Sequence, residues 1–296
     1  MIQYPAEVIG LLRFFEKIIL ILTSILLLLA LLIMPPFSKK LIAMGVMGVY
    51  SSACEKEALT STEGIALSIP GGNASSDGDW FPFVMTFHPG RSFGYTVGKD
   101  LSLSILYNFG DFIPLKGCSS LYDPQSPYYS SFYGAYLVKS GDGSPYGFSV
   151  NGNNIIDSVN ADEIAAVARY DYQNLVLRDF GLTVGNAVFD FEIKNGPDVC
   201  SYAGSDGWYR TDAEMTVNGC AHQKKEFAAS YLQYGIPAFD AERDLAPVRM
   251  FGRIYGKFIE EKSVSVFFYI IAASEDVLET CDRQILSKST VQLKTG

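Results

Sequence analysis

The chain has 296 residues, 48% of them hydrophobic, and a formal net charge of −9 at pH 7. Two acidic and four basic residues precede position 55, so residues 55–296 keep 30 acidic and 19 basic side chains, a net charge of −11. This acidity excludes a nucleic-acid partner, because binding the phosphate backbone requires clustered Lys and Arg.

The first predicted element is an uncharged apolar run, Ile18–Met34. With the apolar residues before it, its length approaches the roughly 20 residues that a helix needs to cross a bilayer. The run therefore predicts a transmembrane helix over 18–34. It lies within an anchor or signal region that covers residues 1–54.

A second apolar run, 41–53, follows Lys39 and Lys40 and ends on Cys54. Basic residues, an apolar stretch and small residues are the parts of a secretory signal. The sequence Ser51-Ser52-Ala53-Cys54 resembles the lipobox of bacterial lipoproteins, although Ser51 replaces the usual aliphatic residue. The resemblance implies that Cys54 is lipidated and becomes the mature N-terminus.

Two interpretations of this region stay open. In the first, Met34 is the true start and residues 34–54 are a lipoprotein signal. In the second, the 18–34 helix is retained as a signal anchor. Both place the rest of the chain on the extracytoplasmic face of a membrane, at the cell surface or in the periplasm.

A polar tether is predicted over 55–63, followed by one α+β domain over 64–296. Short apolar or alternating runs closed by turn residues predict its strands. They cover 65–69, 81–88, 101–109, 131–139 and 187–193.

Two helices are predicted inside this domain. Asn160 is placed to cap the first, with Glu163 in the reciprocal position of a capping box. A weaker helix is predicted over 223–234, ending before Gly235.

The end of the chain has the clearest pattern. Strands over 248–259 and 264–272 are joined at 260–262, which predicts a hairpin. The second strand is apolar on both faces, so we expect it to be covered on both sides and central in its sheet. Ser274 then caps a helix whose buried stripe is predicted to contain Val277, Leu278, Cys281 and Ile285.

This ending, FGRIYGKFIEEKSVSVFFYIIAASEDVLETCDRQILSKST, resembles the close of exported PsbP-like α/β/α domains. Those domains often finish with a strand, a capped helix and a Ser-rich tail. The resemblance implies an antiparallel sheet flanked by helices. It also implies a role in binding or assembly rather than in catalysis.

Residues able to perform catalysis are scarce. The chain has two histidines, His88 and His222, and no HExxH, CxxC, GxSxG or phosphate-loop motif. No metal or other cofactor is therefore expected. Oxygen-rich stretches at 142–143 and 151–157 lack the spacing of a calcium loop and are interpreted as turns. A nucleophile paired with either histidine remains open, because such partners meet in space.

Tyrosines gather between 122 and 146. Tyr122, Tyr128 and Tyr129 lie in a segment stiffened by two prolines, and tyrosine is enriched at recognition surfaces. We therefore predict a ligand-binding loop there, with Asp123, His88 and Arg91 as polar candidates; packing in the core is the alternative for the tyrosines.

The cysteine count suits an exported protein. Cys200 and Cys220 bracket a segment rich in Gly, Ser and Asp, so they are the predicted disulfide. Whether Cys118 and Cys281 also pair is left open.

Together these patterns predict a membrane-anchored extracytoplasmic binding or assembly protein. Its partners would be the membrane, through the anchor, and an envelope protein or a glycan. The alternatives are an exported hydrolase that uses His88 or His222, and an accessory subunit of a membrane complex.

Overall fold

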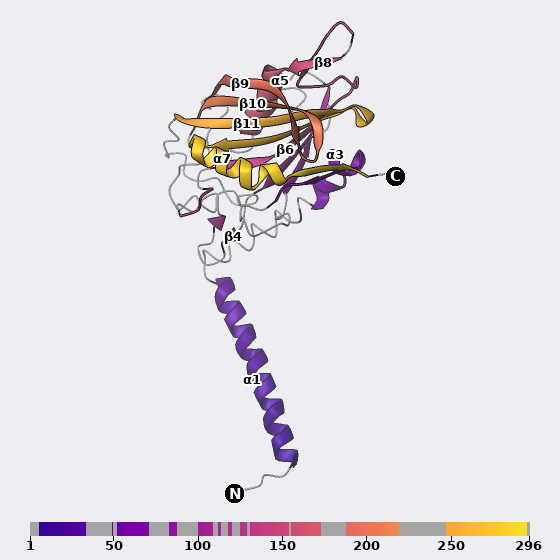
Figure 1. Cartoon of the computed structure of the whole chain (residues 1–296). Coiled ribbons are helices and arrows are strands. Elements are labelled where there is room, and N and C mark those ends of the chain that lie inside the picture. Colours follow the sequence, from indigo (N-terminus) through magenta and orange to yellow (C-terminus); the bar gives the residue numbers. More distant parts are fainter. Residues whose placement is uncertain are drawn as a thin grey trace.

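A seven-stranded antiparallel sheet dominates the fold of the computed structural model (Figure 1). The structure describes residues 6–33, 49, 52–70, 83–87, 100–108, 112–113, 118–119, 125–128, 131–153, 155–172, 188–218 and 247–294. Around the sheet lie helices on both faces and three small two-stranded ribbons. The antiparallel sheet flanked by helices that the sequence predicts is therefore confirmed.

Helix α1, Ala6–Ile33, stands apart from the sheet in Figure 1. It is 28 residues long, and large apolar side chains along it are exposed, among them Leu20 at 71%. Among the residues that the structure describes, no helix combines the length and apolar character that crossing a membrane requires.

The sheet has the strand order β2-β3-β6-β12-β11-β10-β9, with every neighbouring pair antiparallel. Its strands are β2 Phe83–Phe87, β3 Leu101–Asn108, β6 Ser131–Ser140, β9 Phe189–Tyr202, β10 Ser205–Asn218, β11 Pro247–Ile259 and β12 Val264–Ala272.

Strand β12 is the middle strand, as its two apolar faces predict. Val266, Phe268 and Ile270 point to one side, and Phe267 and Tyr269 to the other; all five are buried. The predicted hairpin is also present, with the 3-10 turn η7, Glu260–Lys262, between β11 and β12. Ser263 takes the left-handed conformation that closes this turn.

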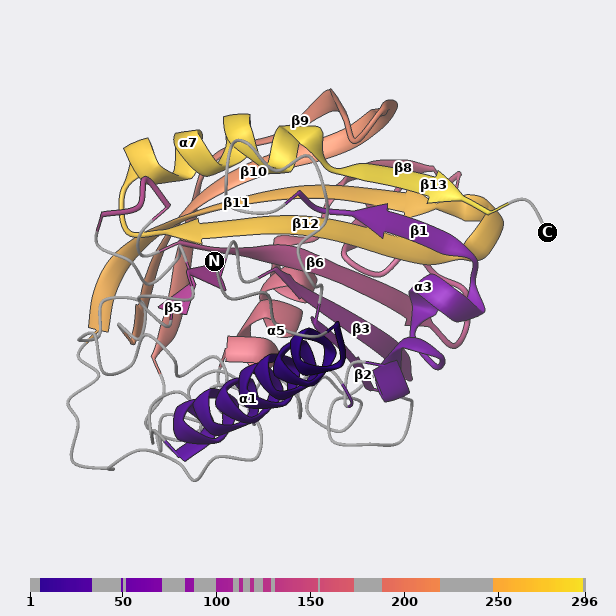
Figure 2. The same ribbon diagram turned by 90° about the horizontal axis from the view of Figure 1, so that it is seen from below.

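Helices α5, Ala161–Asp171, and α7, Glu275–Gln284, cover opposite faces of the sheet (Figure 2). Both predicted caps are present, since Asn160 accepts from the amide of Glu163 and Ser274 from that of Val277. The other half of the predicted capping box, a hydrogen bond from the Asn160 amide to the Glu163 carboxylate, is wrong. The Glu163 carboxylate instead accepts from the amide of Gly147, at 2.6 Å, and so joins α5 to the segment that precedes it in the chain.

Two ribbons extend the layers. Strands β7, Phe148–Val150, and β8, Ile156–Val159, form a hairpin on the α5 face, where Phe148 stacks on Phe267 of the sheet. The short turn η8, Leu286–Lys288, leads into strand β13, Thr290–Leu293. This strand pairs with β1, Ile65–Ser68. The third ribbon joins β4, Phe112–Ile113, to β5, Cys118–Ser119.

The predicted tether over 55–63 is part of the domain. It contains the short helix α3, Leu59–Thr62, and both Ala58 and Leu59 are buried in the core. The Leu59 amide donates to the hydroxyl of Ser104 on β3. Ser104 is therefore buried too, although strict alternation would have placed it on a solvated face. Packing of the domain thus begins at Ala58, because α3 brings apolar side chains back onto the sheet.

A buried ion-pair network joins α7 to the sheet. Arg253 on β11 is 3% exposed and donates to Asp212 on β10 at 2.7 Å and to Asp282 on α7 at 2.5 Å. It also donates to Glu279 on α7. Burial raises the pKa of Asp212, but the hydrogen bonds from Arg253 and Arg210 outweigh that effect and lower it. Arg253 thus holds three carboxylates from two elements around one guanidinium.

Replacing Arg253 with Met tests the importance of this network. We expect the free energy of unfolding of the full chain to fall by about 3–5 kcal/mol, because the buried Asp282 would lose its counter-ion and Asp212 would keep only Arg210. Urea unfolding in detergent, followed by near-ultraviolet circular dichroism, measures the loss. Arg249→Met is the matched control, since the Arg249–Glu214 pair is exposed. Equal unfolding midpoints for the two variants would contradict the prediction.

Candidate site: an apolar cavity beneath helix α5

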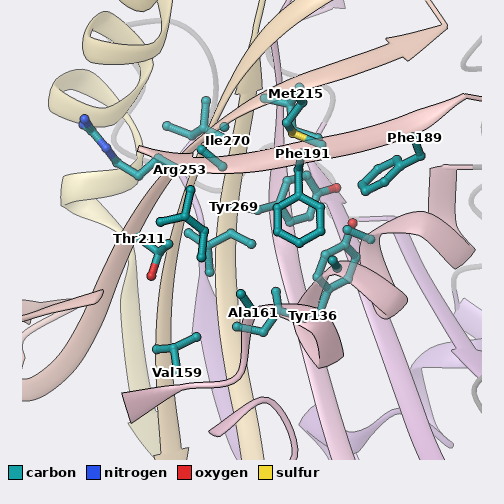
Figure 3. Close-up of a pocket in the computed structure, with 18 residues that line it drawn as sticks. Tyr136, Val159, Ala161, Phe189, Phe191, Thr211, Met215, Arg253, Tyr269 and Ile270 are labelled. Atoms are coloured by element: carbon teal, nitrogen blue, oxygen red, sulfur yellow. The ribbon is translucent and has the colours of Figure 1, made fainter. Parts of the chain in front are cut away.

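A cavity of about 70 Å³ lies between α5 and the sheet (Figure 3). Its walls come from α5, from strands β6, β9, β10, β11 and β12 of the sheet, and from Val159 at the end of β8. Aromatic and aliphatic side chains dominate the lining, including Phe189 and Phe191 of β9, Met215 of β10, and Ile254 and Ile271 of β11 and β12. A well-formed apolar pocket of this kind is the default candidate for a ligand site.

The space exists because small residues face one another across it. Ala161, Ala165 and Ala168 recur at helical spacing along the side of α5 that lines the cavity. Opposite them on the sheet are Ala213 and Gly252, which are directly paired across β10 and β11. A Cβ at Gly252 would lie 3.0 Å from Met215 Sδ, so even alanine would crowd this wall.

The hydroxyl groups of two tyrosines lie at this site, and both belong to a buried polar cluster. Tyr136 and Tyr269 stack with their centroids 4.6 Å apart, and Tyr136 donates to Asp171 of α5 at 2.7 Å. Burial raises the pKa of both phenols well above its usual value, and the charge of Asp171 raises it further. Both tyrosines are therefore neutral at physiological pH and contribute mainly their ring faces to the cavity.

Charge is directed away from the cavity. Arg253 lines it, but its guanidinium is engaged by Asp212, Glu279 and Asp282. Thr211 Oγ1 is buried without a hydrogen-bond partner and is the lining's one such atom among the described residues. The arrangement can enclose an apolar group and exclude water, but it supplies no nucleophile beside a base.

Most of the residues that the sequence proposes for a site lie outside the described residues. These are His88, Arg91, Tyr122, Asp123, Tyr129 and His222. The hydrolase alternative depends on the two histidines and so stays a prediction. No group of three or more potential metal ligands occurs among the described residues.

Tyr128 is described, and it is a core residue. Its side chain is 3% exposed, and its hydroxyl donates to the Gln284 side chain at the end of α7. Its carbonyl also accepts from the hydroxyl of Ser131. The side chain therefore offers no surface to a partner, which corrects its assignment to a recognition face. Packing, the alternative for this tyrosine, is what the structure contains.

The two oxygen-rich stretches are turns, as interpreted from the sequence. Asp142 accepts from the Ser140 hydroxyl and from the Ser144 amide, and these hydrogen bonds lower the pKa of its carboxyl. Asn151 accepts from the amides of Asn153 and Ile155 in the same manner. Local donors thus occupy one side-chain oxygen each of Asp142 and Asn151.

The cavity was not predicted from the sequence. Its signal was the spacing of Ala161, Ala165 and Ala168, which places three small residues beside Ile164 on one side of the helix. That pattern alone cannot separate a cavity from close helix packing. The outcome depends on which residues the sheet presents opposite, and only the strand register provides Ala213 and Gly252 there.

Comparison of the chain with protein-family models, with curated proteins and with solved structures finds no match. The function of this chain is therefore inferred from its own residues.

The strand register opposes the predicted Cys200–Cys220 disulfide. Cys200 on β9 lies opposite Trp208, and Asn218 ends β10 ten residues further on, about 33 Å along the strand. Cys220 itself lies outside the described residues. Two residues beyond Asn218 span at most about 7 Å, whereas a disulfide requires Cα atoms within about 7 Å of each other. The described part of the bracketed segment consists of the end of β9, a turn at Ala203 and Gly204, and strand β10.

We expect Cys200 to be a free thiol in protein recovered from its native compartment. Burial raises its pKa, so it should alkylate more slowly than a solvated thiol but without unfolding. Cys281 provides the comparison, because it is fully buried, donates to Ser131 Oγ and has a pKa raised to about 12 by burial. Mass spectrometry after alkylation should label Cys200 in the folded state and Cys281 only after denaturation. A peptide pair joining Cys200 to Cys220 would refute this prediction.

Proposed function

We propose that this chain is a membrane-anchored extracytoplasmic binding protein that holds a small apolar ligand in the cavity beneath α5. The observation that carries the proposal is the cavity itself, an apolar space lined by one helix and five strands of the sheet. Apolar cavities can accept apolar guests. Filling the space would therefore recover dispersion contacts that the lining residues lack.

The chemistry around the cavity favours binding over catalysis. The hydroxyl of Tyr136 is satisfied by Asp171, and the guanidinium of Arg253 by carboxylates. These groups hold the walls in position, and their hydrogen bonds are already made within the protein. The ligand would be selected by shape and apolar area.

The membrane anchor remains part of the proposal. Two observations support it: the uncharged run Ile18–Met34, and the exposure of apolar side chains such as Leu20 along α1. The signal-like run before Cys54 is the second candidate for an anchor, through a lipid on that cysteine. Either anchor would hold the domain at an extracytoplasmic membrane surface, where an envelope protein or a glycan is the proposed partner.

Intact-mass analysis of the membrane-extracted chain separates the two anchors. If Cys54 carries the lipid, we expect a mature chain that begins at Cys54 and is heavier than its sequence by the attached acyl groups. If α1 is the anchor, the mass includes Ile18–Met34 and Cys54 is unmodified. A chain that lacks both the apolar run and a lipid would refute anchoring altogether.

Filling the cavity tests the binding site. Ala165→Phe places a ring into the space, whereas Ala166→Phe places the same ring on a neighbouring position of α5 that does not line it. Each variant is purified from its native membrane, and the bound small molecules are extracted and quantified by mass spectrometry. We expect wild type and Ala166→Phe to carry the same apolar species. Ala165→Phe should carry at least about tenfold less, a loss of about 1.4 kcal/mol of binding free energy.

Equal amounts of bound species in the two variants would contradict the site. The absence of any apolar species from the wild type would contradict the function. Overpacking can unfold a variant, so Ala168→Val, a smaller change in the same wall, is examined in parallel and should give an intermediate loss.

A further inference from the structure

An exposed guanidinium lies beside the cavity. Arg169, in the last turn of α5, holds its guanidinium carbon 5.5 Å from the ring centroid of Phe189, which lines the cavity (Figure 3). The guanidinium also donates to the backbone carbonyl of Phe189, at 3.4 Å. The attraction of a cation to the ring face and this hydrogen bond together fix the position of the charge. A solvent-exposed cation is therefore kept next to one wall of an apolar space.

Arg169 has no acidic partner among the described residues, although the domain is strongly acidic. Carboxylates do engage the arginines of the sheet, namely Arg210, Arg249 and Arg253. Asp171, two residues further along the chain, is buried and accepts from Tyr136 instead. Asp190 follows Phe189 on β9, so its side chain points to the other face of the sheet. The charge of Arg169 is thus left uncompensated in the part of the chain that the structure describes.

We propose that the ligand of the cavity is a hydrophobic acid, whose apolar body lies in the cavity and whose anionic group binds Arg169 beside it. This inference depends on the function proposed above and names the chemical class of its ligand. The cavity is partly open to solvent, so a bound ligand can keep one end outside. A guanidinium has five N–H donors in a planar fork that matches a carboxylate or a phosphate. The Phe189 carbonyl uses one of them, and the others can bind the oxyanion.

A cationic head group fits this surrounding less well. The buried carboxylates near the cavity are already engaged, Asp171 by Tyr136 and Asp282 by Arg253. The exposed charge beside the cavity is positive, so it would repel an ammonium group. An anionic head, by contrast, is repelled by the acidic domain as a whole and needs a local cation to bind. Arg169 is the cation held at the wall of this cavity.

Three probes with one apolar body test the charge of the head group. Octanoate, 1-octanol and octylammonium share an alkyl chain and are anionic, neutral and cationic at neutral pH. The full chain, kept in micelles of an uncharged detergent, is labelled with ¹³C at its methionine methyl groups. Met215 lines the cavity, and Met250, its directly opposed neighbour on β11, does not. Octanoate should shift the Met215 signal saturably and bind about fivefold more tightly than octanol, the upper end for an exposed ion pair, and octylammonium should bind most weakly.

Variants of Arg169 separate the head group from the apolar body. In Arg169→Gln the octanoate affinity should fall about fivefold, to that of octanol, while octanol binding is unchanged because the cavity is intact. Arg169→Lys keeps the charge without the planar fork and should keep part of the preference. The matched control is Arg283→Gln, because Arg283 is also exposed, lies in the last turn of α7 on the opposite face of the sheet, and has no acidic partner among the described residues. It should bind all three probes as the wild type does.

High salt gives a second readout, which a packing role for Arg169 would not produce. At an ionic strength of about 1 M the Debye length falls to about 3 Å. The preference of the wild type for octanoate over octanol should therefore shrink, and in Arg169→Gln it should stay absent. Comparing the two affinities as a ratio removes the effect of salt on the alkyl chain that they share.

The outcomes separate this inference from the proposed function. If the wild type binds octanoate no more tightly than octanol, or if Arg169→Gln keeps the preference, the hydrophobic-acid ligand is refuted while apolar binding stands. If no probe shifts Met215 and the wild type carries no extractable apolar species, the proposed function fails as well. An octanoyl lysophosphatidic acid distinguishes two sources of the anionic ligand. A saturable Met215 shift with this lipid supports a membrane lipid, and a shift with octanoate alone supports a free acid.

Discussion

The ion pairs of the Arg253 guanidinium are the interaction on which the rest of the domain depends. The guanidinium lies in the middle of the sheet, 3% exposed, and joins β11 to β10 through Asp212 and to α7 through Asp282 and Glu279. A buried charge is tolerated only when its partners are present and well oriented. This requirement fixes the position of α7 on its face. Tyr255 adds an uncharged donor to this network, because its hydroxyl also donates to Asp282.

The same strands present a different chemistry on the opposite face. On β11, Arg253 points toward α7, whereas its neighbours Gly252 and Ile254 line the cavity beneath α5. One face is therefore fixed by directional ionic contacts, and the other can keep an unfilled space. Alternation along a strand makes this separation automatic, since adjacent side chains point to opposite faces. A rigid frame on one face lets the other hold a cavity without collapsing around it.

Several features were predictable because they depend on local pattern. The double apolar face of β12 predicted its central position, and the caps Asn160 and Ser274 marked where α5 and α7 begin. The buried stripe of α7 followed from helical period, with Leu278, Cys281 and Ile285 all buried. Features that depend on distant partners were missed. Tyr128 looked like a loop residue, but it is buried and its hydroxyl donates to Gln284, which is far away in sequence. The segment with Ala58 and Leu59 looked like a tether, but it packs on β3.

By itself, the sequence determined the class of fold, the central strand, the helix starts, the hairpin at 260–262 and the acidic character of the domain. All of these follow from the period of apolar residues and from capping chemistry within a few residues. The tertiary structure alone decided the cavity and the ion-pair network. Ala165 and Gly252 line one cavity, and Arg253 pairs with Asp282, only because strand register and helix docking bring together residues far apart in the chain. A one-residue slip in that register would turn these side chains to the other face.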